Sequence, residues 1–279
     1  CRRFLAFHPD LCIQDVTPSF LANFERWYLS QKNGKNETNS LASVGSVMRS
    51  LRAVIKHHIK KITIPSTYEY PFNEYSIPSH NPAKQVISNS EIQQIVDMTE
   101  FDNKDQEYAR DIWLLLYRMN GINFVDLLKL RWTDIKGKYL IFRRHKTLRT
   151  RRHNIRDIKV FISPKIQSLL DKHCVKSSTF IMGLINKEDY DETYLMNRNK
   201  KLKGKINSHL KQIGAKLGLS LPLDISMARD AYANTMKRAG KSVELIAEQM
   251  NHASTMTTQR HYLDSFDDET LDTANDVIL

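Results

Sequence analysis

The sequence contains little cysteine and no long apolar run. Its 279 residues include three cysteines, Cys1, Cys12 and Cys174. An odd number at such wide spacing excludes a disulfide framework and a paired-cysteine zinc site, and is typical of free thiols in a reducing compartment. Apolar stretches are only a few residues long, against the roughly 20 that cross a bilayer, so no membrane span is expected. No apolar signal segment follows the first residues. The chain starts at Cys1 instead of methionine, so one expectation is that it is part of a longer protein.

Acidic residues are fewer than basic ones. Lysine and arginine number 42 and aspartate and glutamate 31, which gives a formal net charge of +11. Such an excess predicts a polyanionic partner, above all a nucleic acid. Apolar residues make up 41% of the chain, enough to form cores, and the length predicts about two domains.

Helical patterns fill the N-terminal part of the sequence. Thr17 followed by Pro18 is typical of a helix start. A long helix with an apolar stripe is predicted after the polar loop at 32–39. A second stripe on that helix consists only of cations: Arg49, Arg52, Lys56 and Lys60. Two interpretations stay open for it, a solvated charged face and a row of phosphate contacts.

The rest of the chain predicts a second domain. Four prolines between 65 and 83 indicate an extended connector. Helices are expected over 105–119 and 123–130, and the period then changes to that of strands at 139–142 and 158–162. Helices resume from 163. We predict a mainly α-helical fold with a small antiparallel β-sheet (α+β), with a helical domain at 1–82, a linker at 83–90 and a second domain at 91–279.

Two further segments concentrate positive charge. Residues 138–159 hold nine lysines or arginines and one acid, and residues 193–216 hold seven and no acid. Both runs predict salt-sensitive contact with a nucleic-acid backbone but say nothing about chemistry. The residues expected to contact DNA there are Arg143, Arg144, Lys200 and Lys203.

Ordered motifs carry the functional prediction. Gly121-Ile122-Asn123-Phe124-Val125-Asp126 opens a short helix, and Lys146 lies between the two predicted strands. Further along, Arg229 follows three residues after Ser226, and Tyr262 follows ten residues after His252. In this order, the set resembles the tyrosine recombinase (phage-type integrase) family, especially integrases of mobile elements.

The resemblance covers nearly the whole chain and implies a function. Residues 1–82 resemble the family's helical, SAM-like core-binding domain and the remainder its catalytic domain, the two forming a clamp around DNA. The implied activity is site-specific recombination, in which a tyrosine hydroxyl attacks a DNA phosphodiester to give a 3′-phosphotyrosyl enzyme. The implied partners are double-stranded DNA and further copies of the chain, as a homo-tetramer on two duplexes. No cofactor or metal is implied, and the expected location is cytoplasmic, at the nucleoid.

The resemblance also assigns roles to single residues. Tyr262 matches the nucleophile, a phenol whose pKa near 10 requires activation. Arg229 matches a guanidinium on the nonbridging oxygens, Lys146 the general acid for the leaving 5′-oxygen, and His252 a hydrogen-bond partner of the phosphate. Asp126 matches an acidic residue that supports the catalytic side chains without itself contacting the phosphate.

Three departures from the family pattern are visible. Asn123 stands where the family usually has its first catalytic arginine, and could instead cap a helix with Asp126 in a capping-box arrangement. Arg149 or Arg118 could then supply the missing cation. Ser226 replaces a histidine or lysine, and the spacing from His252 to Tyr262 is one residue longer than is usual.

These departures leave more than one function open. The first is an active recombinase. The second is a recombinase-like DNA-binding accessory protein with weak or no cleavage. The third is an unrelated helical transcription factor, which leaves the positions of Lys146 and Tyr262 unexplained. The tail after Tyr262 carries Leu271, Ala274 and Ile278 at helical spacing, which suits either a frayed end or docking on a neighbouring protomer.

Overall fold

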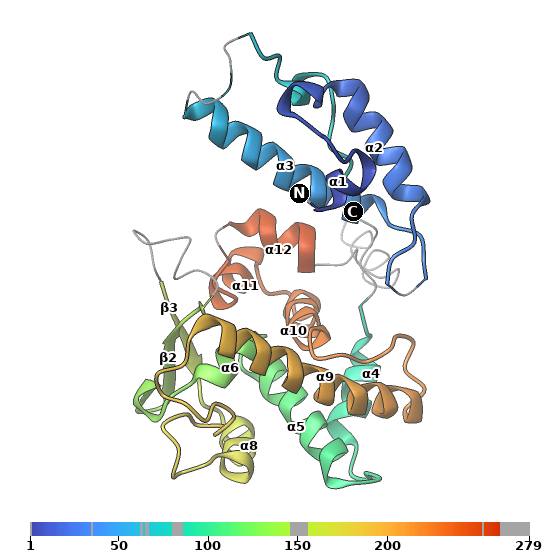
Figure 1. Cartoon of the computed structure of the whole chain (residues 1–279). Helices are drawn as coiled ribbons and strands as arrows, with labels where there is room; N and C mark the ends of the chain where they lie inside the picture. Colours follow the sequence, from blue (N-terminus) through green and yellow to red (C-terminus); the bar gives the residue numbers. More distant parts are fainter. Residues whose placement is uncertain are drawn as a thin grey trace, which may run out of the picture. The chain divides into compact units, whose positions relative to one another are not determined.

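The chain forms two compact units, Cys1–Pro82 and Ala83–Leu279, and each has its own apolar core (Figure 1). The structure is a computed structural model, which describes residues 2–34, 36–61, 64, 67–79, 86–145, 156–252 and 254–262. Mainly helical structure with a small antiparallel sheet is confirmed. No helix among the described residues is long and apolar enough to cross a membrane.

The first unit is helical. Thr17 caps its second helix through a hydrogen bond from the Phe20 N–H to the Thr17 hydroxyl, and Pro18 is the first helical residue, as predicted. Ser40 caps the long helix in the same way. An additional short helix at the N-terminus was not predicted. The elements are α1 (Arg2–Phe7), η1 (Ile13–Asp15), α2 (Pro18–Ser30), α3 (Leu41–Lys60) and η2 (Pro71–Asn73).

The proline-containing segment after α3 belongs to this unit. Tyr70, Phe72 and Tyr75 pack against its core, and the Tyr75 hydroxyl donates to Glu25 on α2. The segment is therefore fixed to the unit along much of its described length, and is not a free connector.

The second unit surrounds α5. This helix is buried along most of its length and packs against α9, α10 and α8 (Figure 1). Trp113 is fully buried, and its indole N–H donates to the Asp224 carbonyl at 3.1 Å, which fixes the segment that leads into α10. The elements are α4 (Asn89–Asp97), α5 (Lys104–Arg118), α6 (Phe124–Lys129), η3 (Trp132–Asp134), β1 (Ile135–Lys136), β2 (Tyr139–Arg143), β3 (Asp157–Phe161), α8 (Pro164–His173), α9 (Glu192–Lys216), α10 (Met227–Arg238), α11 (Val243–Gln249) and α12 (Thr255–Tyr262).

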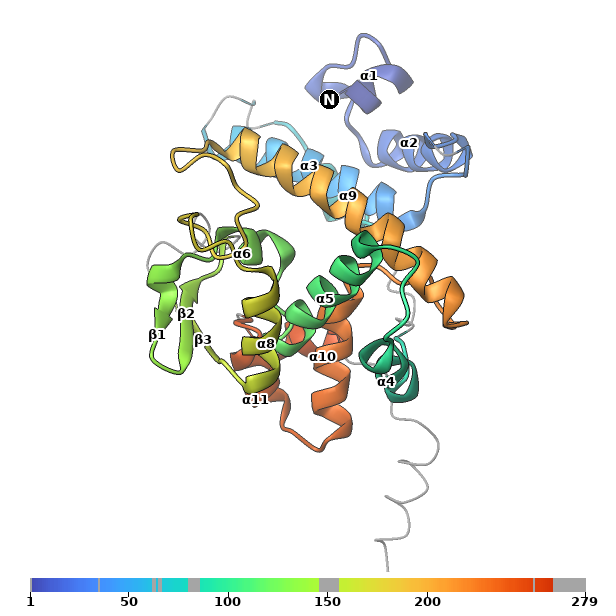
Figure 2. The same ribbon diagram turned by 90° about the horizontal axis from the view of Figure 1, so that it is seen from below.

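The sheet lies at one edge of this unit, away from α4 (Figure 2). Its strand order is β1-β2-β3, with Leu140 opposite Val160 and Arg143 opposite Asp157. Strands β2 and β3 were predicted. The two-residue β1 was not, because so short a strand carries no periodicity of its own.

Helix α4 begins inside the predicted linker. Ser88 and Glu91 form a capping box, with the Glu91 N–H donating to the Ser88 hydroxyl and the Ser88 N–H donating to the Glu91 carboxylate. This reciprocal cap starts the helix at Asn89, so the end of the segment 83–90 is already cap and helix.

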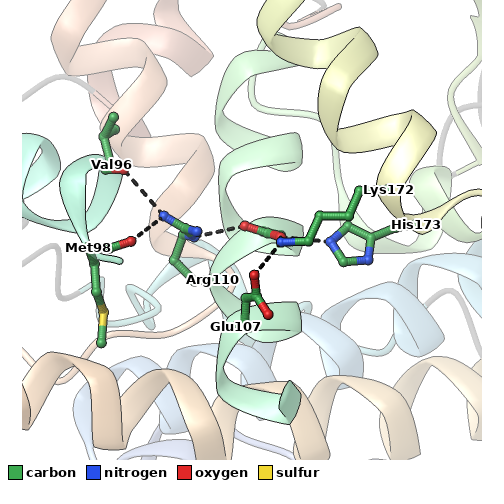
Figure 3. Close-up of polar contacts among 7 residues, drawn as sticks. Val96, Met98, Glu107, Arg110, Lys172 and His173 are labelled. Atoms are coloured by element: carbon green, nitrogen blue, oxygen red, sulfur yellow. Dashed lines mark hydrogen bonds and ion pairs between the residues drawn. The ribbon is translucent and has the colours of Figure 1, made fainter. Parts of the chain in front are cut away.

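A buried carboxylate joins three helices of the second unit. Asp111 on α5 is 1% exposed and accepts hydrogen bonds from Arg110 Nε at 2.8 Å, Lys172 Nζ at 2.7 Å and His173 Nε2 at 2.7 Å (Figure 3). Arg110 also donates to the carbonyl of Met98, just past α4. Burial raises the pKa of Asp111, but the hydrogen bonds from His173 and Lys172 outweigh it and hold the pKa at about 2. The cluster therefore ties α4 and α8 to α5.

We expect Asp111→Asn to lower the free energy of unfolding by about 3 kcal/mol, because an amide leaves the largely buried Arg110 and His173, and the more exposed Lys172, without their anion. Chemical denaturation at pH 7 measures the change. The matched control is Asp171→Asn on the exposed part of α8, which removes the same charge and is expected to change stability by less than about 0.5 kcal/mol.

The stabilising effect of Asp111 is expected to depend on pH. The pKa of Asp111 lies at about 2 in the folded chain, below the value of about 3.9 for an unfolded chain. Its contribution is therefore complete above pH of about 4 and is lost as the pH falls toward 2. The stability difference between the parent and Asp111→Asn should shrink over that range, and a difference that stays constant would contradict this role.

Candidate active site

Arg229 lies at the centre of the predicted site. It projects from the first turn of α10 and is only 7% exposed. Its guanidinium donates to the carbonyls of Gly121 and Met250, the latter at 2.8 Å. A guanidinium only donates hydrogen bonds, so these carbonyls fix the direction of its plane. The charge is thus held in one orientation by main-chain atoms on either side.

Gly121 allows this close approach. Its φ is +63°, and a Cβ at this position would lie 3.0 Å from Arg229 Cα and 3.1 Å from Arg229 Cγ. Glycine is required here for both its backbone conformation and its lack of a side chain. The sequence indicated Gly121 only as the first residue of the motif that opens the short helix, and its packing against Arg229 was missed.

His252 meets Arg229 from the end of α11. The N–H groups of Asn251 and His252 donate to the carbonyls of Glu248 and Ala247, and Asn251 has a φ of +51°. This is a Schellman ending, which turns the chain sharply after the helix. It places His252 Nε2 at 2.8 Å from Arg229 NH2. The extra residue between His252 and Tyr262 therefore does not displace the histidine from Arg229.

The partners of His252 define its protonation. Arg229 can only donate, so Nε2 accepts, and the ring proton is on Nδ1. Nδ1 lies 2.7 Å from the hydroxyl of Thr258, which is fully buried on α12. Tyr262 is the last residue of α12, one helical turn after Thr258, and its side chain lies outside the described part of the chain. His252 thus connects Arg229 to the helix that ends in Tyr262. The contact is made through Thr258, whose role was not predicted.

A pocket of about 290 Å³ brings several predicted residues together. Asn123, Ser226, Arg229 and Lys203 all line it. Lys203 comes from α9, so one of the cations predicted to contact DNA lies beside the predicted catalytic positions. The hydroxyl of Ser226 is exposed and donates to the carboxylate of Asp224. Among the described residues, no His, Cys, Asp and Glu side chains gather into a group that could hold a metal ion.

Asp126 supports the segment next to the predicted general acid. It is 4% exposed on α6, and its carboxylate accepts a hydrogen bond from the His145 main-chain N–H at 2.8 Å. Burial raises the pKa of Asp126, while this N–H and the nearby Arg144 charge act against the increase. The His145 ring lies 3.0 Å from Glu192 at the start of α9. His145 is thereby anchored on two sides, immediately before Lys146, which lies with Arg149 outside the described residues.

Asn123 does not complete a capping box. It is the N-cap residue of α6, but its side chain makes no cap hydrogen bond. The amide is satisfied when its oxygen faces Arg144, where it accepts from NH2 at 2.9 Å and from Nε at 3.1 Å. The expected arrangement with Asp126 is wrong because a guanidinium that follows β2 competes for the same acceptor.

The other predicted DNA contacts lie on both units. Arg49, Arg52, Lys56 and Lys60 are exposed along α3 of the first unit. On the second unit, Lys200 is exposed on α9, and Arg143 is exposed and forms an ion pair with Asp157 at 2.8 Å. Arg118, the other candidate cation, is half-buried at the end of α5, and burial lowers its pKa.

Comparison with protein families accounts for most of the chain. The model described as the phage integrase family matches residues 85–269, and that of a phage integrase SAM-like domain matches residues 1–76. A comparison with curated proteins finds no match.

Solved structures share the fold at low sequence identity. The XerH site-specific recombinase bound to its palindromic difH substrate aligns with a TM-score of 0.63 and 15% identity over 99% of this chain and 76% of that chain. The Tn1549 transposon integrase in complex with transposon right end DNA has a TM-score of 0.63 and 12% identity, with coverage of 100% and 92%. A lambda integrase dimer bound to a COC′ core site has a TM-score of 0.59 and 16% identity, with coverage of 96% and 90%.

The packing of Gly121 against Arg229 leads to a testable prediction. Gly121→Ala should lower the free energy of unfolding by about 1–2 kcal/mol for the left-handed backbone and by about 1–3 kcal/mol more for the contact with Arg229. Gly137→Ala is the matched control, because Gly137 has a φ of +58° and nothing within 4 Å of an added Cβ. Urea denaturation of both variants measures the difference, and equal losses would contradict the contribution of the contact.

Proposed function

Because the chain belongs to the phage integrase family, we propose that it is a site-specific DNA recombinase that cleaves and rejoins DNA through a 3′-phosphotyrosyl intermediate. The observation that carries this proposal is the connection from the buried Arg229 through His252 and Thr258 to the helix that ends in Tyr262. A held guanidinium beside the helix of a tyrosine nucleophile suits phosphoryl transfer, where the protein mainly positions groups and stabilises charge.

The proposed reaction conserves phosphodiester bonds. The Tyr262 hydroxyl gives up its proton to solvent, attacks the phosphorus and forms the phosphotyrosyl bond, while the bond to the 5′-oxygen breaks. Lys146 gives a proton to that oxygen, which leaves as a 5′-hydroxyl. A 5′-hydroxyl of a new partner strand then attacks the phosphotyrosine, which rejoins DNA and restores the phenol. Water is not consumed, so the exchange needs no external energy source.

The remaining side chains have positioning roles in this scheme. Arg229 meets the charge that develops on the nonbridging oxygens. Neutral His252 holds one edge of that guanidinium and is itself placed next to the phosphate. Asp126, through the His145 N–H, fixes the strand end from which Lys146 follows. Ser226 can offer the phosphate only its hydroxyl, and that hydroxyl already donates a hydrogen bond to Asp224.

Double-stranded DNA is the proposed partner. The exposed cations of α3 and of α9 give each unit a surface for phosphates, and the two units would enclose the duplex as a clamp. Recombination needs two duplexes, so we propose assembly as a homo-tetramer on them. The Tn1549 transposon integrase among the similar structures supports a mobile element as the context. Action at the nucleoid is part of the same proposal.

One further function has its own support. The neutral Asn123 and the hydroxyl of Ser226 replace groups with charge or acid–base capacity, which favours a DNA-binding accessory protein with weak or no cleavage. Covalent attachment to DNA distinguishes this function from the first.

Covalent capture tests the enzyme directly. In cells that carry the DNA surrounding the gene, the full chain should form a denaturation-resistant adduct at discrete DNA sites, and Tyr262→Phe should form none because it lacks the attacking oxygen. Sequencing of the protein-linked DNA maps the sites. Tyr139→Phe on β2 removes another tyrosine hydroxyl and should leave the adduct unchanged. Equal, adduct-free recovery of parent and Tyr262→Phe, despite DNA binding, would favour the accessory protein.

The stripe on α3 is tested by salt dependence. Arg52→Ala should weaken binding to duplex DNA and reduce the slope of log K against log salt by about 0.9, the value for one phosphate contact. Fluorescence anisotropy at several salt concentrations measures the slope. Lys165→Ala removes an exposed cation from α8 and should not change it. An unchanged slope for Arg52→Ala would indicate a solvated face.

A further inference from the structure

A second arginine lies next to the position that the family pattern leaves without one. Asn123 occupies the place of the usual first catalytic arginine and lines the same pocket as Arg229. With the Asn123 amide oriented so that its oxygen faces Arg144, which satisfies both of its polar atoms, that oxygen accepts two hydrogen bonds, from NH2 at 2.9 Å and from Nε at 3.1 Å. These two bonds define the plane of the Arg144 guanidinium.

The direction of Arg144 follows from the strand before it. Along β2 the side chains alternate, so Phe142 is buried, Arg143 is exposed, and Arg144 is half-buried on the inner side. Arg143 pairs with Asp157 across the sheet at 2.8 Å. Two neighbouring arginines therefore have different environments, and only Arg144 faces the site.

Arg144 and Arg229 both line a narrow gap of about 10 Å³, together with Asn123 and Asp126. Asn123 and Arg229 also line the pocket of about 290 Å³, so Arg144 reaches the edge of that pocket through Asn123. The buried Asp126 carboxylate, whose pKa is acted on by the Arg144 charge, offsets part of the repulsion between two guanidiniums in one place. Two positive groups thus lie beside Asn123, which itself lines the pocket that contains Arg229 and Ser226.

We propose that Arg144 supplies the second guanidinium for the scissile phosphate and that Asn123 positions it. This inference rests on the proposed recombinase function. The charge that the family pattern places at the start of α6 comes instead from the end of β2, two residues before Lys146. Asn123 is then a positioning residue for a planar, bidentate donor and is not the remnant of a lost catalytic group.

Single-turnover cleavage tests the proposal, on a duplex that contains a site mapped through the Tyr262-dependent adduct. Arg144→Ala should lower the cleavage rate about 100-fold at saturating protein, the typical effect of removing one donor to a transition-state oxyanion. Its Kd for the duplex should change little in comparison. Lys165→Ala, which removes an exposed cation from α8, is the control and should cleave like the parent. Arg144→Gln is measured alongside, so that the comparison survives if the alanine variant does not fold.

The role of Asn123 is tested by coupling and rescue. Asn123→Ala should slow cleavage in the parent but have no further effect in Arg144→Ala, because its contribution passes through Arg144. Asn123→Arg combined with Arg144→Ala should recover at least about tenfold of the lost rate, by restoring a guanidinium from the other side. A merely structural Asn123 would give additive losses and no rescue.

The outcomes separate the two proposals. Cleavage by folded Arg144→Ala within about threefold of the parent, with Tyr262→Phe inactive, would overturn the role of Arg144 and leave the recombinase function intact. Absence of any Tyr262-dependent adduct from the parent would overturn both. A loss confined to Arg144 variants, with rescue by Asn123→Arg, supports the proposal.

Discussion

A guanidinium removed from water needs acceptors for its N–H groups, and the arrangement around Arg229 satisfies that need. The acceptors come from three places in the sequence: the carbonyl of Gly121, the carbonyl of Met250 and the ring of His252. Each requires a particular local conformation. Gly121 has the left-handed backbone that only glycine adopts at such close range, and α11 ends in a Schellman turn that brings His252 back toward α10. Desolvation of one charge thus determines how α10, α11 and the start of α6 meet.

The opposite side of the site depends on a second buried charge. Asp126 holds the His145 main chain, and through it the end of β2, against α6. The same strand end carries Arg144 to Asn123. The sheet is small, but its second strand leads Arg144 to the site. An extended strand places neighbouring side chains on opposite faces, so Arg143 and Arg144 have different surroundings.

The stability of the scaffold is separate from the site. The Asp111 cluster fixes α4, α5 and α8 through ion pairs and hydrogen bonds that include no predicted catalytic residue. Trp113, two residues further along α5, bonds to the segment before α10. Helix α5 therefore fixes the position of α10 relative to the core, and Arg229 projects from α10. Rigid helices with a few charged contacts at their ends suit a reaction that depends on positioning.

The sequence by itself determined the helices, most of their starts and the order of the motifs. A cap such as Thr17 with Pro18 acts over one helical turn, and apolar periodicity acts within one element, so both can be recognised locally. The family resemblance similarly rests on ordered residues. The tertiary structure alone decided what those residues contact. Three contacts join segments that become adjacent only when the chain packs. They are the contact of Asn123 with its partner, the contacts of Arg229 with two carbonyls, and the contact of His252 with Thr258. The Asn123 side chain pairs with Arg144 and does not complete a cap with Asp126 for the same reason. A hydrogen bond forms with the donor that the folded chain brings within reach, whatever its distance in sequence.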